Sequence, residues 1–447
     1  MTQAEEVSVR TLVHETRETP ANYEIAFSEN NPSVSFKETN MTSGDLKSIF
    51  GQIDPSSPIA HEILNRARTL CVKHLGGAWA DVTLDKFILK PVTGGISNLL
   101  FLVELPKDVA VLKSEPSQVV LRVFCQENYD QLIIESVVFT LLSERGLGPK
   151  LLGVFPGGRF EEYIPSRPLH CDELSDPKFA KIIAPMVARV HALDVPITKQ
   201  PEVISTGRDW LRKFRQTPGG QQPIIMRTTE TTVDKSRFPE ALTIDDLERE
   251  WDFVEKFVKS YGSPLVFSHN DLQKGNILLK TGYELCDDGR VLLDGTETSS
   301  DPLVLIDFEY STYNYRGFDF GNHFCEYGFD YDCDSSPYYK VLEDRFKLPD
   351  HWRTYCKKYL EETYKTLNTE HSDMSPHSIT GNLEEDLEKL VEEASIFMPI
   401  SHLFWSLWSL VNAESSVIVF DYAAYGRDRL ALYFDRKPEL EKLLNRQ

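Results

Sequence analysis

The sequence has 447 residues, of which 41% are hydrophobic and 26% are charged, and its formal net charge is −21 at pH 7. This composition is ordinary for a globular protein that is long enough to form two lobes, and it excludes a fibrous or wholly disordered chain. A strongly acidic surface repels phosphodiester backbones, so we expect no nucleic-acid partner.

The seven cysteines are scattered and form no Cys-x-x-Cys pair, which favours free thiols in a reducing compartment. The N-terminal region has no apolar run of signal-peptide length, and nowhere do about 18 apolar residues follow one another without interruption. The sequence therefore predicts a cytoplasmic protein with no membrane span.

Hydrophobic periodicity predicts an α+β chain of two lobes. Residues 1–45 are polar and aperiodic, so we expect a flexible tail there. Residues 46–165 are expected to form a small β-rich lobe, with a helix over 58–75, two strands around a glycine turn within 87–105, a strand over 119–124 and a helix over 131–145. The stretch 160–165 is expected to be a hinge.

Residues 166–447 are expected to form a larger, mainly helical lobe, with one helix near 179–193 and a long helical region over 383–434. Two polar segments, 217–232 and 281–301, lack a core-forming pattern and are interpreted as surface insertions. The second contains Asp287-Asp288-Gly289, which is typical of a hairpin turn.

The segment that indicates chemistry is a polar loop, His269-Asn270-Asp271-Leu272-Gln273-Lys274-Gly275-Asn276, between two apolar strands. A second apolar strand, 303–306, ends in Asp307. Phosphoryl transfer needs a carboxylate on the attacking hydroxyl and oxygen ligands for magnesium. Asp271 is the predicted catalytic carboxylate, and Asn276 and Asp307 are the predicted Mg²⁺ ligands. Taken singly, Asp271 and Asn276 are more typical of a turn cap, and it is the joint pattern with the strand ending in Asp307 that favours kinase chemistry. We expect His269 to brace the loop rather than transfer a proton.

Upstream residues are candidates for binding ATP. Backbone amides of a glycine turn can approach phosphate closely, and the strand residue Arg122 needs a partner, which Glu135 on the following helix can supply. The same two residues are also consistent with a purely structural ion pair. The predicted nucleotide contacts are Gly94, Gly95, Ser97, Asn98, Arg122, Glu135 and the hinge residues Glu162 and Ile164.

These motifs resemble the choline/ethanolamine kinase family, which belongs with aminoglycoside phosphotransferases and protein kinases. The resemblance covers roughly residues 63–434, and its most specific stretches are 269–279 and 305–326, the latter including Ile306-Asp307-Phe308-Glu309-Tyr310. It implies a bilobal, protein-kinase-like fold and a cytosolic, often dimeric enzyme. The implied activity is transfer of phosphate from ATP to choline, the first step of phosphatidylcholine synthesis. Glu309 stands where protein kinases have glycine, so a protein substrate is not expected.

Aromatic residues accumulate near the C-terminal end of the chain. Trp405 and Trp408 are three residues apart and share a helix face, an arrangement that without the resemblance is more typical of a core. Quaternary ammonium groups favour an aromatic box with nearby carboxylates. With the resemblance, the predicted choline pocket consists of Glu309, Tyr310, Glu326, Tyr331, Trp405, Trp408, Phe420 and Tyr425.

Two other functions remain open. An ethanolamine kinase, or a dual choline/ethanolamine kinase, would bind a primary ammonium group that donates hydrogen bonds to carboxylates. A kinase-like module without catalysis is disfavoured because Asp271, Asn276 and Asp307 are all present.

Overall fold

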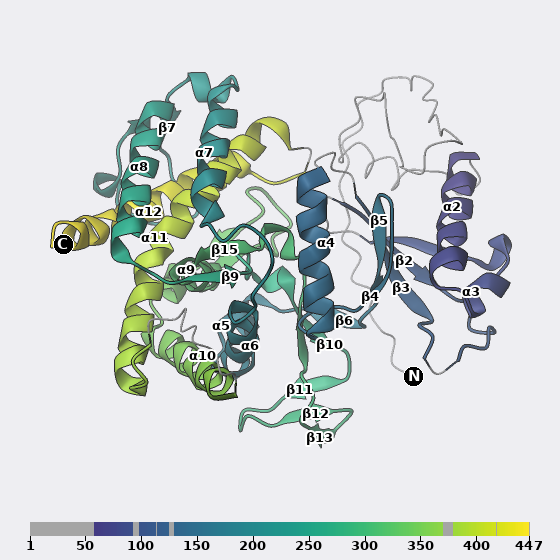
Figure 1. The fold of residues 1–447 in the computed structure, drawn as a ribbon. Coiled ribbons are helices and arrows are strands. Elements are labelled where there is room, and N and C mark those ends of the chain that lie inside the picture. The colour runs from purple at the N-terminus through teal and green to yellow at the C-terminus, as the bar shows by residue number, and fades with distance from the viewer. Residues whose placement is uncertain are drawn as a thin grey trace.

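The computed structural model describes residues 58–92, 98–112, 114–124, 129–369, 379–416 and 418–446. Figure 1 shows a sheet-rich lobe on one side of helix α4 and a larger, mainly helical lobe on the other. The predicted two-lobed α+β architecture is therefore confirmed. The expected tail over 1–45, Cys125 and the glycine turn over 93–97 lie outside the described residues.

The N-terminal lobe is built on a five-stranded antiparallel sheet in the order β1-β2-β3-β5-β4. The two predicted helices and the predicted strands are present. Gly76 and Gly146 take the left-handed conformations (φ 64° and 65°) that end the two helices. Its elements are α2 (Pro58–His74), α3 (Ala78–Asp81), η1 (Leu84–Lys86), β1 (Ile88–Val92), β2 (Asn98–Glu104), β3 (Gln118–Phe124), α4 (Tyr129–Glu144), β4 (Leu151–Phe155) and β5 (Gly158–Glu162).

The C-terminal lobe begins after residues 163–165 and is dominated by helices. Its helices are α5 (Cys171–Ser175), α6 (Pro177–His191), α7 (Glu202–Arg215), α8 (Ile244–Tyr261), α9 (Arg316–Glu326), α10 (Pro349–Thr369), α11 (Leu383–Ser415) and α12 (Tyr422–Leu444). Its 3-10 turns are η2 (Gly219–Gln221), η3 (Lys235–Arg237), η4 (Lys274–Asn276), η5 (Phe308–Tyr310) and η6 (Glu343–Phe346).

Short antiparallel strands carry the polar loops of this lobe. They are β6 (Ser166–Pro168), β7 (Ile224–Ile225), β8 (Ala241–Leu242), β9 (Leu265–Ser268), β10 (Ile277–Lys280), β11 (Tyr283–Leu285), β12 (Val291–Leu293), β13 (Thr296–Thr298), β14 (Leu303–Leu305), β15 (Thr312–Tyr315), β16 (Phe329–Asp330) and β17 (Lys340–Val341). Strand β10 pairs with both β14 and β6, and β9 pairs with β15.

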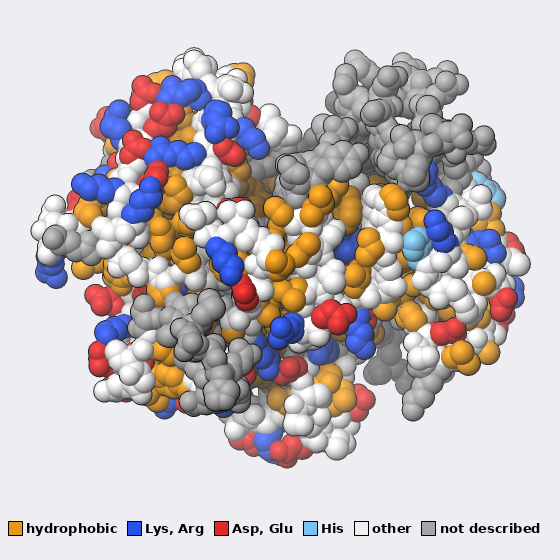
Figure 2. Space-filling model, in the orientation of Figure 1, with side chains coloured by type: hydrophobic (Ala, Val, Ile, Leu, Met, Phe, Trp, Pro, Cys, Tyr) orange, Lys and Arg blue, Asp and Glu red, His pale blue; other side chains and the backbone are white. Residues whose placement is uncertain are grey.

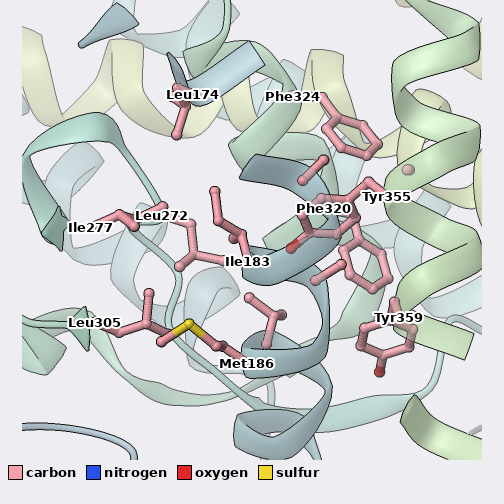
Figure 3. Packing of buried hydrophobic residues seen from close by; sticks show 14 of the residues in the cluster. Leu174, Ile183, Met186, Leu272, Ile277, Leu305, Phe320, Phe324, Tyr355 and Tyr359 are labelled. Carbon is pink, nitrogen blue, oxygen red and sulfur yellow. The ribbon is translucent and has the colours of Figure 1, made fainter. Parts of the chain in front are cut away.

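A hydrophobic core lies directly beneath the two polar loops singled out in the sequence. Figure 3 shows Leu272, Ile277 and Leu305 packed with Ile183 and Met186 of α6. Leu272 and Ile277 are fully buried and Leu305 is nearly so. Because the apolar residues that flank the loops are anchored in one core, the loops themselves are held at its surface.

Helix α11 is long and apolar enough, by length and composition, to cross a membrane. However, 83% of its most apolar window is buried inside the protein. It packs against α9, α7, α10 and α12, which is the environment of a core helix.

The six cysteines among the described residues are all free, as expected.

The second polar insertion folds as a small three-stranded sheet, β11-β12-β13, rather than as an irregular loop. The predicted hairpin turn over Asp287-Asp288-Gly289 is confirmed: Cys286 and Arg290 close it with a 2.9 Å backbone hydrogen bond, and Gly289 has φ 90°.

Figure 2 shows acidic and basic side chains intermixed over the region of α7 and α8, so this face carries no uniform acidic field.

Gly321 provides a stability test of the contact between α9 and α11. A Cβ at this position would lie 2.6 Å from the backbone carbon of Phe397, so Gly321→Ala must push the helices apart. We expect it to lower the free energy of unfolding by about 1–3 kcal/mol, measured by chemical denaturation. The control is Gly426→Ala within α12, where the nearest atom is 3.4 Å away and alanine should stabilise the helix by about 0.5–1 kcal/mol. Equal effects of the two substitutions would contradict the close packing of α9 on α11.

Candidate active site

The polar loop between β9 and β10 is held by a buried carboxylate on α9. Asp319 accepts hydrogen bonds from the backbone N–H groups of His269 (3.0 Å) and Asn270 (2.8 Å). It also accepts one from Nε2 of His191 at the end of α6 (2.9 Å). Burial favours the neutral acid, but these donors outweigh it and hold the pKa of Asp319 below its ordinary value. The ionised carboxylate therefore fixes the start of the loop.

Asn270 adopts a left-handed backbone conformation (φ 66°), which asparagine tolerates better than most residues. Its side-chain Nδ2 donates to the carbonyl of Tyr310 (2.9 Å), and its Oδ1 accepts from Nδ2 of the buried Asn314 (2.7 Å). Asn270 thus connects the loop to the segment after Asp307. The sequence pattern does not predict this role, although an asparagine between a strand and a predicted catalytic carboxylate is a usable signal.

His269 braces the loop, as predicted. Its Nε2 donates to the carbonyl of Ile306 (3.0 Å), and its Nδ1 accepts from the backbone N–H of Asp271 (3.3 Å). Its ring contacts Phe308 at a centroid distance of 4.6 Å. Burial lowers the pKa of His269 despite the nearby Asp319 carboxylate, so the imidazole is neutral and both ring nitrogens are engaged.

Asp271 and Asn276 lie together at the surface of the core. The Asn276 amide donates from Nδ2 to the Asp271 carboxylate (2.8 Å) and to its backbone carbonyl (2.9 Å). Burial raises the pKa of Asp271 well above its ordinary value, and the charges of Glu326, Asp307 and Glu309 raise it further. Carboxylates from three separate stretches of the chain therefore converge on one place.

Asp307 is brought beside Asn276 by the pairing of β14 with β10. Ile277 is opposite Leu305, and the N–H of Ile306 donates to the carbonyl of Asn276 (3.0 Å). Asp307 itself has a left-handed backbone (φ 62°), which turns the chain sharply at the end of the strand. The three oxygen-bearing side chains predicted to form one site are thus neighbours.

The residues present fit a magnesium site. Among the described residues, no group of three His, Cys, Asp or Glu side chains forms a closed metal cage. Mg²⁺ is usually held by one or two carboxylate or amide oxygens, with waters and nucleotide phosphates completing its octahedron. Asn276 and Asp307, on adjacent strand ends, offer such a set, with Asp307 supplying the negative charge.

Arg122 lies across the interlobe cavity from Asp307. Both residues line this cavity together with Glu135, Arg159 and Glu309. Burial lowers the pKa of Arg122, but the Glu161 carboxylate and, to a lesser extent, that of Asp307 raise it above its ordinary value. A permanent cation beside the predicted metal ligands is suited to bind nucleotide phosphates.

The expected pairing of Arg122 with Glu135 is wrong. The partner of Arg122 is Glu161 on β5 (Nε to Oε1, 2.6 Å), and Glu135 instead accepts from Arg159 (3.0 Å). Arg159 also donates to Glu161 (2.7 Å), so the four side chains form one chain of alternating charge. The reason is strand register: Arg122 is directly opposite Arg159, and Glu161 lies on the same face two residues away.

The other predicted nucleotide contacts are only partly covered. Gly94, Gly95 and Ser97 lie outside the described residues, and Asn98 is the buried first residue of β2. Glu162 accepts from the backbone of Lys150 (3.1 Å), and the carbonyl of Ile164 accepts from Ser166 (2.7 Å). Both residues lie at the junction of the two lobes, and their contact with a nucleotide stays a prediction.

Aromatic rings from four segments form one continuous chain beside Asp271. It begins at Tyr310, whose pKa is raised by burial and by the charges of Glu309 and Asp271. Successive ring centroids are 5.0–5.6 Å apart along the series Tyr310, Trp405, Trp408, Tyr422, Phe420 and Tyr425. Tyr331 joins the far end, 6.4 Å from Phe420 and 6.2 Å from Tyr425.

All six aromatic residues predicted from the sequence therefore belong to this aromatic chain. Tyr422 was not predicted, although it connects Trp408 to Phe420. It follows Phe420 by two residues, and only the turn before α12 places both rings together. Trp405 is fixed further by a 2.7 Å hydrogen bond from its indole N–H to Asn322 of α9.

Glu326 lies at the far end of the aromatic chain, where its carboxylate has two partners. It accepts a 2.8 Å hydrogen bond from the Tyr331 hydroxyl and forms an ion pair with Arg429, which is fully buried on α12. Arg429 also donates from Nε to the Tyr425 hydroxyl (2.9 Å). Arg429 was not predicted, but its spacing of four residues after Tyr425 puts both on one helix face.

A scan of protein families matches residues 89–434 to the choline/ethanolamine kinase model. The chain belongs to the choline/ethanolamine kinase family. Members of this family are ATP-dependent kinases, so the coarse activity predicted from the polar loops is supported.

Two curated relatives illustrate the similarity. The chain is 40% identical over 414 residues to "Choline kinase A2" of Caenorhabditis elegans, covering 88% of this chain and 90% of that protein. It is 37% identical over 390 residues to a human "Choline/ethanolamine kinase", covering 86% and 89% of the two chains.

The fold is also shared with a solved choline kinase of Cryptosporidium parvum. The two structures superpose with a TM-score of 0.62 at 22% identity, over 85% of this chain and 96% of the other. This likeness supports the predicted kinase-like fold of the family.

The role of Asp319 can be tested with Asp319→Asn. The amide has one acceptor oxygen in place of two, so at least one loop N–H loses its partner and the loop shifts. We expect the free energy of unfolding to fall by about 1–3 kcal/mol and the turnover number to fall by about tenfold or more, measured by denaturation and steady-state kinetics.

The matched control is Asp386→Asn. Asp386 is similarly buried and accepts from the backbone of Thr380 (2.8 Å) and from Tyr364 (2.6 Å) near the start of α11. It should cost similar stability with little change in turnover. If both variants lose turnover equally, the loss reflects general destabilisation and not the position of the loop.

Proposed function

We propose that the protein transfers the γ-phosphoryl group of magnesium-bound ATP to the hydroxyl group of choline. The observation that carries this proposal is that the aromatic chain begins at Tyr310, whose carbonyl accepts a 2.9 Å hydrogen bond from Asn270, the residue before Asp271. A phosphoryl-transfer loop and a surface suited to a quaternary ammonium group thereby share one site.

In the proposed reaction, Asp271 orients the substrate hydroxyl and accepts its proton. The hydroxyl oxygen forms a bond to the γ-phosphorus while the bond to the bridging oxygen breaks, so phosphocholine and ADP are the products. Asn276 and Asp307 would hold Mg²⁺, which when bound neutralises phosphate charge. Arg122, supported by Glu161, supplies a fixed positive charge on the opposite side of the cavity.

Choline is favoured over other alcohols by the chemistry of the aromatic chain. A trimethylammonium group donates no hydrogen bond, and its attraction to each ring face is worth roughly 0.5–2 kcal/mol. Rings and carboxylates occur together at both ends of the aromatic chain: Tyr310 follows Glu309 at one end, and Tyr331 donates to Glu326 (2.8 Å) at the other. The charges of Glu326 and Glu309 both raise the pKa of Asp271.

Ethanolamine is the second candidate substrate. Glu309 and Glu326 offer carboxylate oxygens that could accept hydrogen bonds from a primary ammonium group. However, Glu326 already accepts from Tyr331 and pairs with Arg429, which leaves it less able to attract a second cation. Dual activity is compatible with this arrangement, with choline preferred.

The homodimer and the cytoplasmic location implied by the family resemblance stay predictions.

The reaction itself is tested by supplying Mg²⁺ and ATP with choline, ethanolamine, an aminoglycoside and a serine peptide, and identifying the phosphorylated product. We expect choline to be the best acceptor.

In Asp271→Asn, turnover should fall by about two to four powers of ten with ATP affinity nearly unchanged, because only the oriented carboxylate is removed. The control is Asp287→Asn, whose side chain is 99% exposed. Near-normal turnover in Asp271→Asn would refute the assigned role.

Trp408 tests the choice between the two amino alcohols. Trp408→Ala removes a ring face, so we expect the KM for choline to rise by about 2- to 30-fold and the KM for ethanolamine to rise less. Trp408→Phe keeps a ring and should restore much of the choline affinity. Equal losses for both substrates would show that the ring contributes packing and no cation recognition.

A further inference from the structure

A second cavity lies between α6, α10 and the hairpin β11–β12, and it shares no lining residue with the cavity at Arg122 and Asp307. Lys178, Lys181, Ile182 and Pro185 of α6 line one wall. Their spacing of three, four and seven residues puts them on a single helix face. Helix α10 contributes the opposite wall at the same spacing: Lys358, Glu361, Glu362 and Lys365.

This groove is basic in an otherwise acidic protein. Of its twelve lining residues five are cations and two are carboxylates, whereas the whole chain has a formal net charge of −21. The cations come from three separate elements, because Arg290 of the hairpin faces the two helices. Cations that converge from different elements on one cavity create a local positive potential.

The ion pairs that the groove cations make are ones that an incoming anion can displace. Lys358 pairs with Glu361 and Lys365 with Glu362, in each case three residues apart on α10. The Lys365 side chain is 74% exposed, whereas Glu362 is 18% exposed and also lies 3.9 Å from Arg189. Such pairs contribute little, because water screens them. Lys181 is exposed and has no ion-pair partner among the residues that the structure describes.

Acidic residues at the rim compete for two of the cations. Lys178 lies 3.6 Å from Asp176 and 3.4 Å from Asp287, and Arg290 lies 2.7 Å from Asp288. The Lys178 contacts are long, and Asp287 is almost fully exposed. These carboxylates therefore reduce the positive potential at the hairpin side and leave the floor between α6 and α10 basic.

We propose that this groove binds a phosphate-bearing ligand, with Lys181 and Lys365 as its principal contacts. Ammonium groups on flexible side chains act as point charges toward phosphate, and Ile182, Pro185 and Leu285 provide an apolar surface for the rest of the ligand. The phosphate belongs either to a soluble phosphomonoester or to the head group of an anionic lipid.

The two helices that line the groove are connected to the loop that carries Asp271 by hydrogen bonds. Helix α6 ends at His191, which accepts from the Tyr359 hydroxyl of α10 (3.0 Å) and donates to Asp319 (2.9 Å). Asp319 in turn holds the N–H groups of His269 and Asn270. A ligand between α6 and α10 would thus contact the two helices that support the loop.

The test uses the full chain with its nucleotide site occupied by a non-hydrolysable ATP analogue. Inorganic phosphate and glycerol 3-phosphate are titrated by calorimetry, and cosedimentation is measured with phosphatidylcholine vesicles that do or do not contain phosphatidate. The double variant Lys181→Glu/Lys365→Glu is compared with Lys213→Glu/Lys256→Glu, which makes the same charge change at exposed lysines of α7 and α8. Thermal unfolding checks that both variants are folded.

We expect saturable binding by the unchanged protein and by the α7/α8 variant, and affinity lower by about tenfold or more in the groove variant. Binding of the soluble phosphates identifies a phosphomonoester as the ligand, whereas binding only to phosphatidate vesicles identifies a lipid head group. The proposal is overturned if neither source binds saturably, or if the two double variants lose affinity equally. None of these measurements depends on which alcohol the active site phosphorylates.

Discussion

The position of the catalytic loop depends on one buried carboxylate. Asp319 joins the loop to α6 and to its own helix, α9, because it accepts from His269, Asn270 and His191. A buried charge is stable only when it is fully hydrogen-bonded, and a carboxylate that accepts three such bonds permits few other loop positions. The position of Asp271 follows from that constraint, since it comes directly after the anchored pair, and Asn276 is then held by its hydrogen bonds to Asp271.

The active site combines this anchor with a sheet contact. Pairing of β10 with β14 aligns Asn276 and Asp307, although 30 residues and a separate three-stranded sheet intervene between them. The two strand ends are fixed by the buried residues Ile277 and Leu305, and the insertion packs against the same core through Tyr283 and Leu285. Rigid strands therefore place the reacting groups, and the loops between them carry the polar atoms.

Charge is distributed unevenly across the site. Asp271, Asp307, Glu309 and Glu326 lie close enough for the last three to raise the pKa of the first. Arg429 balances Glu326 on the proposed substrate side, and Arg122 and Asp307 line one cavity on the proposed nucleotide side. An acidic centre between these two arginines is suited to bind a divalent cation and an organic cation near each other, which is what phosphorylation of choline requires.

Much of the local structure and chemistry could be read from the sequence. The helix and strand periodicities, the hairpin turn and the bracing role of His269 were predicted, because each depends on neighbouring residues or on a short motif. The convergence of Asp271, Asn276 and Asp307 was predicted from the joint pattern of two motifs typical of kinases, and the pairing of β10 with β14 accounts for it. Side-chain contacts between residues distant in sequence were harder to predict. The partner of Arg122 is Glu161, 39 residues away, and it is selected by the register of β3 on β5, which no spacing in the sequence reveals.

Only the tertiary structure decided that Arg429 neutralises Glu326, that Tyr422 completes the aromatic chain, and that lysines of α6 and α10 face one groove. The physical reason is that side-chain pairing across packed elements depends on where those elements meet, whereas periodicity and turn chemistry are properties of each segment alone.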